Sequence, residues 1–257
     1  MTNRYEKMSN AFIPFVMLGD PDIPTSLKIV QTLIDNGADA LELGIPFSDP
    51  SADGPVLQRA AMRALRAGVT PTHCLQAIHT LRARNPEVPI GLLVYANLVV
   101  RPGIDAFYER AALAGVDSVL VADVPTLEAK PFVDAALKYG IDPVLIAPPN
   151  ASHSQLQEIA KLCKGYTYVV TRKGVTGTNT DLNLSSDKLI QTLRSLGAPP
   201  AVLGFGISKP EHVHAAFAQG ALGAISGSAL AEIIEKSLDN PHQLLETIAQ
   251  FVRDMKG

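Results

Sequence analysis

Residues 40–55 read ALELGIPFSDPSADGP, and this stretch indicates both the fold and the candidate site. The stretch begins as a short apolar strand and ends as a loop rich in Gly and Pro. Successive side chains of a strand alternate between its two faces, so Leu41 and Leu43 share one face while Glu42 lies on the other. If the leucines pack against surrounding helices, Glu42 points into the middle of the sheet.

Glu42 has no lysine or arginine close to it in sequence. A buried carboxylate without a basic partner is costly to ionise, so its pKa rises and it becomes a candidate proton donor or acceptor. A buried ion pair with a distant basic residue is the alternative. Asp53 adds a second carboxylate eleven residues further on, although Asp in such a turn commonly bonds its own backbone.

A short apolar run, a loop and a longer amphipathic segment recur along the chain, which is typical of alternating strands and helices. The predicted strands are 12–18, 40–45, 90–95, 118–122, 143–147, 166–171, 201–205 and 223–226. The predicted helices include 24–35, 71–84, 104–114, 128–139, 154–163, 186–196 and 211–218.

A similar short sequence recurs where a predicted helix ends and the next predicted strand begins. It reads NGADALEL from Asn36, AGVDSVLV from Ala114, YGIDPVLI from Tyr139 and QGALGAIS from Gln219. The glycine suits the left-handed position that follows a helix. Eight strands alternating with helices over about 250 residues predict an α/β fold, the closed (β/α)₈ TIM barrel, as a single domain over residues 1–257 with extra short helices. An open doubly wound sheet is the alternative.

Composition, charge and cysteine spacing argue against several classes of function. Hydrophobic residues make up 47% of the 257 residues and charged residues 18%, which supports a large core. A net charge of -3 without a basic run argues against nucleic acid or an anionic membrane as partner. Cys74 and Cys163 have no paired spacing and the six histidines form no metal triad, so we expect reduced thiols and no metal. No apolar stretch approaches the ~20 residues that span a bilayer, which predicts a soluble cytoplasmic protein.

Glycines follow the last two predicted strands. In barrels of this class, phosphate commonly binds at the loops after strands seven and eight. GFGISKPEH carries Gly204 and Gly206, and Ser208 stands at capping-box spacing from Glu211, so we expect a helix to begin there. SGSALAEII, from residue 226, places Gly227 and Ser228 before another helix. Free N–H groups at these helix starts favour an anion.

The remaining polar candidates lie nearby. KGVTGTNTD, residues 173–181, follows strand six and is long and polar, which suits a mobile lid over a substrate. Ordinary turns are the alternative for all three glycine stretches. Tyr95 and Asn97 end strand three and Tyr168 lies on strand six, where a tyrosine either packs or contacts substrate.

The motifs match a known family in order and over nearly the whole length. They are FVMLGDP at Phe15, ELGIPFSDPSADGP at Glu42, YANL at Tyr95, VADVP at Val121, GYTYVVTRKGVTG at Gly165, GFGIS at Gly204 and AISGSA at Ala224. The chain closely resembles the alpha subunit family of tryptophan synthase. The resemblance implies retro-aldol cleavage of indole-3-glycerol phosphate to indole and glyceraldehyde 3-phosphate, with no cofactor in this subunit. It also implies an α2β2 complex with a beta subunit that uses pyridoxal phosphate.

The resemblance also assigns residues. Glu42 corresponds to the general acid/base that protonates the indole ring carbon and helps deprotonate the glycerol hydroxyl. Asp53 corresponds to the carboxylate that receives the indole N–H. The implied substrate-binding residues are Phe15, Leu93, Tyr168 and Thr176, with Thr176 on the lid, and the implied phosphate contacts are Gly177, Gly206, Gly227 and Ser228.

Three positions depart from the family pattern. Ser51 stands where leucine is usual, Met17 where threonine is usual and Leu203 where glutamine is common. Ser51 lies on the loop expected to meet the beta subunit, so partner contact or loop packing is where a difference is expected. The alternatives are another phosphate-binding barrel, such as indole-glycerol-phosphate synthase or phosphoribosylanthranilate isomerase, or a barrel that only activates a partner.

Overall fold

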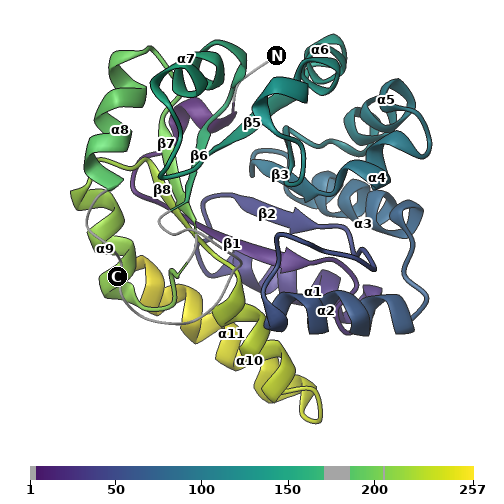
Figure 1. Cartoon of the computed structure of the whole chain (residues 1–257). Coiled ribbons are helices and arrows are strands. Elements are labelled where there is room, and N and C mark those ends of the chain that lie inside the picture. Colours follow the sequence, from purple (N-terminus) through teal and green to yellow (C-terminus); the bar gives the residue numbers. More distant parts are fainter. Residues whose placement is uncertain (1–3, 171–185, 205) are drawn as a thin grey trace.

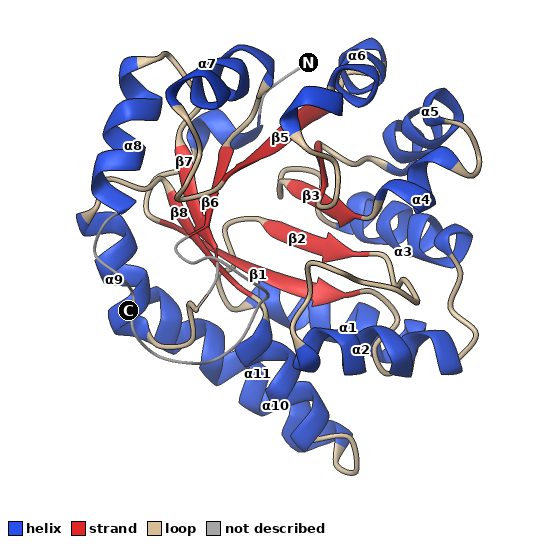
Figure 2. Ribbon diagram, viewed as in Figure 1, coloured by secondary structure: helices blue, strands red, loops and turns tan. Residues whose placement is uncertain are grey.

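The structure, a computed structural model, describes residues 4–170, 186–204 and 206–257. Eight parallel strands pair in sequence order and close into a barrel, β1 pairing with β8, and helices form an outer ring (Figures 1 and 2). The strands are β1 Ala11–Met17, β2 Leu41–Gly44, β3 Ile90–Val94, β4 Ser118–Val121, β5 Asp142–Ala147, β6 Thr167–Val170, β7 Ala201–Gly204 and β8 Gly223–Ser226. The eight predicted strands are confirmed with small shifts at their ends, except that residues 171 and 205 lie outside the described residues. The closed barrel is confirmed, and the open doubly wound sheet is wrong.

The helical elements of the described chain are η1 Arg4–Lys7, α1 Ile23–Asp35, α2 Pro55–Arg66, α3 Pro71–Arg84, α4 Ala96–Val100, α5 Ile104–Ala114, η2 Thr126–Glu128, α6 Lys130–Lys138, α7 His153–Leu162, α8 Ser186–Ser195, α9 Pro210–Ala218, α10 Ser228–Lys236 and α11 Pro241–Lys256. The seven predicted helices are confirmed with small shifts at their ends. The short helices η1, α4 and η2 are the expected additions to the repeat.

The glycines of this recurring sequence end helices as predicted. Gly115 follows α5 with φ of 89°, and its N–H reaches Ala112 O at 2.9 Å. The next N–H, from Val116, reaches back to Ala111 O at 3.1 Å, so two carbonyls at the end of the helix are satisfied before the chain enters β4. Gly37, Gly140 and Gly220 adopt the same positive φ before their strands. Each of these helices therefore ends at a glycine that turns the chain toward the next strand.

The barrel divides the buried side chains into two clusters. Leu41 and Leu43 belong to the outer cluster, packed between the sheet and the helices. Phe15, Tyr168 and Ile225 belong to the inner cluster, inside the barrel. Glu42 alternates with the leucines along β2, so it points inward as its sequence position predicts. None of the described helices combines the length and the hydrophobicity that a membrane span requires.

Candidate active site

Glu42 lies inside the barrel and is only 1% exposed. Its neighbours across the sheet are Phe15 on β1 and Gly91 on β3. The Tyr166 hydroxyl donates to Glu42 Oε1 at 3.1 Å, whereas Oε2 has no hydrogen-bond partner among the described residues. Burial raises the pKa of Glu42 to about 8, the bond from Tyr166 opposes this, and the charge of Asp53 adds to it. No described basic side chain pairs with Glu42, so the buried ion pair is not found.

Asp53 lies in the loop between β2 and α2 and is 4% exposed. Its backbone N–H closes a turn onto Pro50 O at 3.1 Å, but Oδ2 of its side chain has no partner within the described chain. Burial raises the pKa of Asp53 to about 6, and a hydrogen bond with Tyr95 opposes this. The Tyr95 hydroxyl also accepts the Ala52 N–H at 3.2 Å, so this tyrosine orients the loop that carries Asp53. The two carboxylates therefore differ in the pH range over which they ionise.

Tyr166 is a site residue that the sequence reading missed. It reaches Glu42 from across the barrel, and Tyr5 of η1 packs edge-on against it with ring centroids 5.3 Å apart. Tyr5 also shares a buried hydrogen bond of 2.7 Å with Ser118 on β4. The hydroxyls of Tyr5, Ser118 and Tyr166 therefore place polar groups in the barrel interior near Glu42. The signal was available, because Tyr166 and Tyr168 are two residues apart and side chains at that spacing share a face of a strand.

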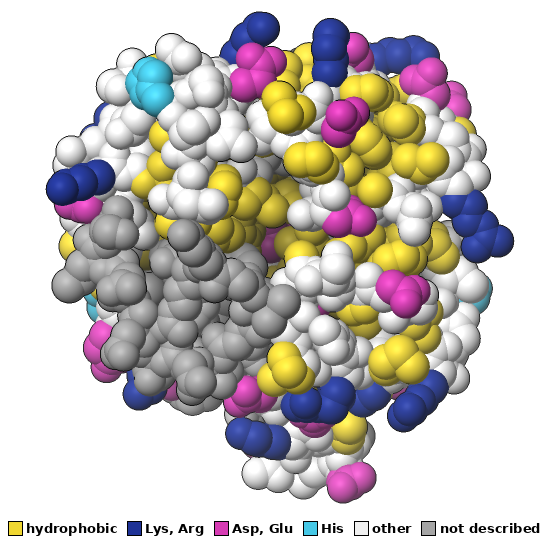
Figure 3. All heavy atoms as spheres, in the orientation of Figure 1, with side chains coloured by type: hydrophobic (Ala, Val, Ile, Leu, Met, Phe, Trp, Pro, Cys, Tyr) yellow, Lys and Arg dark blue, Asp and Glu magenta, His cyan; other side chains and the backbone are white. Residues whose placement is uncertain are grey.

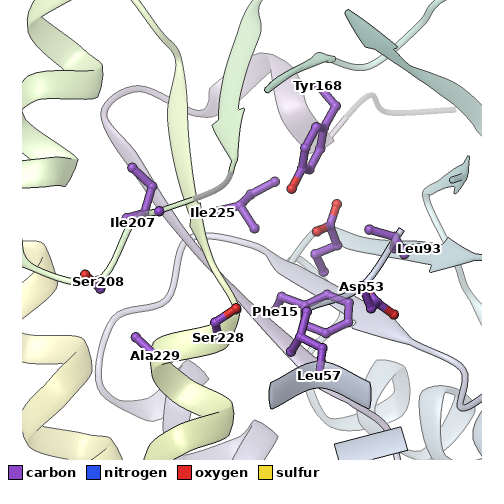
Figure 4. Close-up of a pocket in the computed structure, with 13 residues that line it drawn as sticks. Phe15, Asp53, Leu57, Leu93, Tyr168, Ile207, Ser208, Ile225, Ser228 and Ala229 are labelled. Carbon is purple, nitrogen blue, oxygen red and sulfur yellow. The ribbon is translucent and has the colours of Figure 1, made fainter. Parts of the chain in front are cut away.

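Apolar side chains form the wall beside the carboxylates. Phe15, Leu93 and Tyr168 line one pocket together with Glu42 and Asp53. In Figure 4 the Tyr168 hydroxyl points into this pocket, while Asp53 and Leu93 lie on the side away from Ser208. Figure 3 shows a hollow near the centre of this face, bordered in part by hydrophobic atoms and with acidic atoms visible inside. A flat aromatic ring with one polar N–H suits such a wall with a carboxylate at its edge.

Glycine permits the position of Tyr168. A Cβ built on Gly204, the residue paired across from the end of β6, would clash with the Tyr168 hydroxyl oxygen. Any side chain there would push the tyrosine out of its place.

The opposite end of the pocket is a helix N-terminus. α10 begins at Ser228 with Gly227 as its N-cap, and no side chain caps it. Gly227, Ser228 and Ala229 line the pocket, so the start of the helix, where the first N–H groups have no partner within the helix, lies at this end. Gly206, with φ of 79° and nothing within 4 Å of a built Cβ, lies at the same end. This arrangement suits an anion.

The expected helix cap at Ser208 is wrong. α9 begins at Pro210 with Lys209 as N-cap and no side-chain cap, because Pro fits the first position of a helix. Ser208 instead donates its backbone N–H to His212 Nδ1 at 3.2 Å, and it lines the pocket. It therefore belongs to the anion end of the site without starting the helix.

The pocket brings together most of the residues predicted from sequence: Phe15, Glu42, Asp53, Leu93, Tyr168, Gly206, Gly227 and Ser228. Thr176, Gly177 and the predicted lid 173–181 lie outside the described residues. Of the three departures, Met17 faces the barrel interior, Leu203 packs on the outside and Ser51 is exposed in the turn before Asp53. Within the described ranges, no group of three metal-ligating side chains is found.

A family model for the tryptophan synthase alpha chain matches residues 1–257. The chain belongs to the tryptophan synthase alpha chain family. The family member from Vibrio cholerae is 56% identical over 99% of this chain and 98% of that protein, and the one from Salmonella choleraesuis is 55% identical over 98% and 94%. Among solved structures, the tryptophan synthase complex of Pyrococcus furiosus contains a chain 32% identical to this one, with a TM-score of 0.85 over 96% of this chain and 98% of that chain.

Proposed function

We propose that the chain catalyses the alpha reaction of tryptophan synthase, the retro-aldol cleavage of indole-3-glycerol phosphate to indole and glyceraldehyde 3-phosphate. The observation that carries the proposal is one pocket with two carboxylates of different pKa at one end and an uncapped helix start at the other. Indole fits the apolar wall, and the phosphate ester fits the N-terminus of α10. Family membership supports the same reaction.

The two carboxylates have different roles: Glu42 transfers protons and Asp53 stabilises positive charge. At neutral pH Glu42, with a pKa near 8, holds its proton, while Asp53, with a pKa near 6, is ionised. Glu42 donates its proton to the indole ring carbon that bears the glycerol chain, and the positive charge that develops on the ring nitrogen is stabilised by the Asp53 carboxylate.

The Glu42 carboxylate then removes the proton of the neighbouring chain hydroxyl. The carbon–carbon bond breaks as the hydroxyl oxygen becomes the aldehyde oxygen of glyceraldehyde 3-phosphate. The electrons of that bond return to the ring, so indole leaves neutral and Glu42 is protonated again. Tyr166 holds Oε1 throughout, which leaves Oε2 as the oxygen that exchanges the proton.

The chain acts with a partner. Its relatives of known structure include the α2β2 complex of Pyrococcus furiosus, and a beta subunit is accordingly the partner of this chain. We propose that pyridoxal phosphate belongs to that beta subunit and that no cofactor is needed in this pocket. Exposed Ser51, on the loop that carries Asp53, is the expected place for partner contact. Membership of an amino-acid biosynthetic family supports a cytoplasmic location.

The test is indole release from indole-3-glycerol phosphate by wild type, Glu42→Gln and Asp53→Asn, each with and without a beta subunit. We expect each substitution to lower the rate by at least about a hundredfold, since each removes a group that moves or stabilises charge. Retention of most activity by Glu42→Gln would refute the proposed mechanism. Lys256→Met, which breaks an ion pair with Asp39 on the outside of the barrel, is the control and should keep full activity.

The alternatives are separated by the same assay. The described residues that line the pocket include no lysine, which a related indole-glycerol-phosphate synthase is expected to need. Turnover of the substrates of that synthase or of phosphoribosylanthranilate isomerase would favour those enzymes. Normal activation of a beta subunit without any cleavage would favour a purely regulatory barrel.

A further inference from the structure

A cluster of four charged side chains joins three elements that carry the site. Arg63 on α2 donates from Nε and Nη2 to the two carboxylate oxygens of Asp20 at 2.7 and 2.8 Å, and from Nη1 to Glu235 on α10 at 2.8 Å. Arg59, one turn earlier on α2, donates from Nε and Nη2 to the same Glu235, both at 2.8 Å. We call Asp20, Arg59, Arg63 and Glu235 the interhelix cluster.

Within the interhelix cluster the Asp20–Arg63 pair is largely buried, whereas Arg59 is 53% exposed. The Asp20 side chain is 1% exposed, Arg63 16% and Glu235 26%, and each carboxylate accepts two bonds from one guanidinium. Paired, planar contacts of this kind fix geometry as well as charge. The two arginines hold the pKa of Glu235 down at about 2, so Glu235 is charged across the physiological range.

Each end of the cluster leads directly to the pocket. α2 begins just after Asp53 and α10 begins at Ser228, and the first turn of each helix lines the pocket. At 1.5 Å per residue, Arg63 and Glu235 lie about 10 Å further along their helices than these first turns. Asp20 belongs to the turn that follows β1, the strand that carries Phe15.

The interhelix cluster adds directional bonds to the packing between α2 and α10. α2 and α10 are in contact, and Ala60 and Ala61 of α2 share a buried cluster with Ala231 of α10. Small side chains allow close approach but interlock less than large ones, which form deeper ridges and grooves. Directional bonds from Arg59 and Arg63 to Glu235 oppose sliding of one helix along the other.

We propose that Arg63 and Glu235 are positioning residues that set the distance between the carboxylate end and the phosphate end of the site. The inference rests on the proposed function, because it needs indole at Asp53 and phosphate at the start of α10. A substrate that spans both ends gains affinity only when both contacts fit at once, whereas a fragment that fills one end is indifferent to the distance between them.

The experiment compares three ligands by calorimetry. Indole-3-propyl phosphate, a substrate analogue without hydroxyls, spans the site; indole and glycerol 3-phosphate each fill one end. For Glu235→Ala we expect the Kd of the spanning analogue to rise by about tenfold or more, while both fragments stay within about twofold of wild type. Glu235→Gln keeps an acceptor oxygen for the arginines and should recover most of the affinity.

The controls separate positioning from general stability. Lys256→Met, at the C-terminal end of α11, loses an ion pair of similar exposure made with Asp39 and should leave all three ligands unchanged. If Glu235→Ala does not fold, Arg59→Met serves instead, since the structure gives Arg59 side-chain bonds to Glu235 alone among the described residues and leaves buried Asp20 paired.

Two results would overturn the inference. Unchanged binding of the spanning analogue by Glu235→Ala would show that the cluster sets no distance, and equal weakening of all three ligands would show a general loss of structure. A different failure points to the proposed function itself: if wild type does not bind the spanning analogue, or if Ser228→Asp does not weaken glycerol 3-phosphate, the phosphate end is misassigned and the inference falls with it.

Discussion

The stability of this protein should depend on pH through Glu42, and replacing Glu42 with Gln should remove that dependence. The folded chain holds the pKa of Glu42 at about 8, against an ordinary value of 4.5. Below pH 4.5 both folded and unfolded chains bind the proton. Between pH 4.5 and 8 only the folded chain keeps it, so the free energy of unfolding falls as the pH rises. Above pH 8 both are ionised and the loss is complete.

The size of the effect follows from the two pKa values. At 1.4 kcal/mol for each pH unit, the shift from 4.5 to about 8 corresponds to a loss of about 5 kcal/mol, of which about 3 kcal/mol is reached at pH 7. Gln is close to protonated Glu in shape and can still accept the bond from Tyr166. The two proteins should therefore be about equally stable near pH 4.5, and Glu42→Gln should be the more stable by an amount that grows up to pH 8.

The assay is urea unfolding followed by circular dichroism at each pH from 5 to 9, at constant ionic strength. Asp53→Asn is the matched comparison in the same pocket, and its gain should end near pH 6, where the folded pKa of Asp53 lies. Asp134→Asn, on the exposed face of α6, should run parallel to wild type. A constant difference between wild type and Glu42→Gln over this range would refute the buried, protonated glutamate.

Three further predictions address the site. Tyr166→Phe removes the donor that lowers the pKa of Glu42, so the upper limb of the pH profile of kcat/KM should move to higher pH, read from initial rates of indole release; an unchanged profile would deny the contact. Ser228→Asp places a negative charge at the open start of α10, and KM should rise at least about tenfold with kcat less affected. Gly204→Ala forces a Cβ against the Tyr168 hydroxyl, so unfolding should be easier by about 1–3 kcal/mol and turnover should drop, whereas wild-type behaviour would mean that the tyrosine has room to move.

Local sequence determined most of the architecture. Alternation placed Leu41 and Leu43 outside and Glu42 inside, and the glycines that follow the helices marked where strands begin. Both are properties of a few adjacent residues, because the strand period and the left-handed turn are set by backbone geometry. Tyr168 and the glycines after strands seven and eight were found for the same reason, since all parallel strands of a barrel end at one face, whereas Phe15 and Leu93 were assigned from the family resemblance.

Only the tertiary structure decided the partners of those residues. Tyr166 reaches Glu42 across 124 residues of sequence, and Arg63 reaches Glu235 across 172. Ser208 stood at capping-box spacing, yet Pro210 moved the helix start and left Ser208 at the pocket. The difference between the pKa values of two carboxylates likewise depends on what surrounds each one after closure. Periodicity is local and can be recognised in a single segment. Burial and long-range hydrogen bonds exist only after β8 has paired with β1 and the barrel has closed.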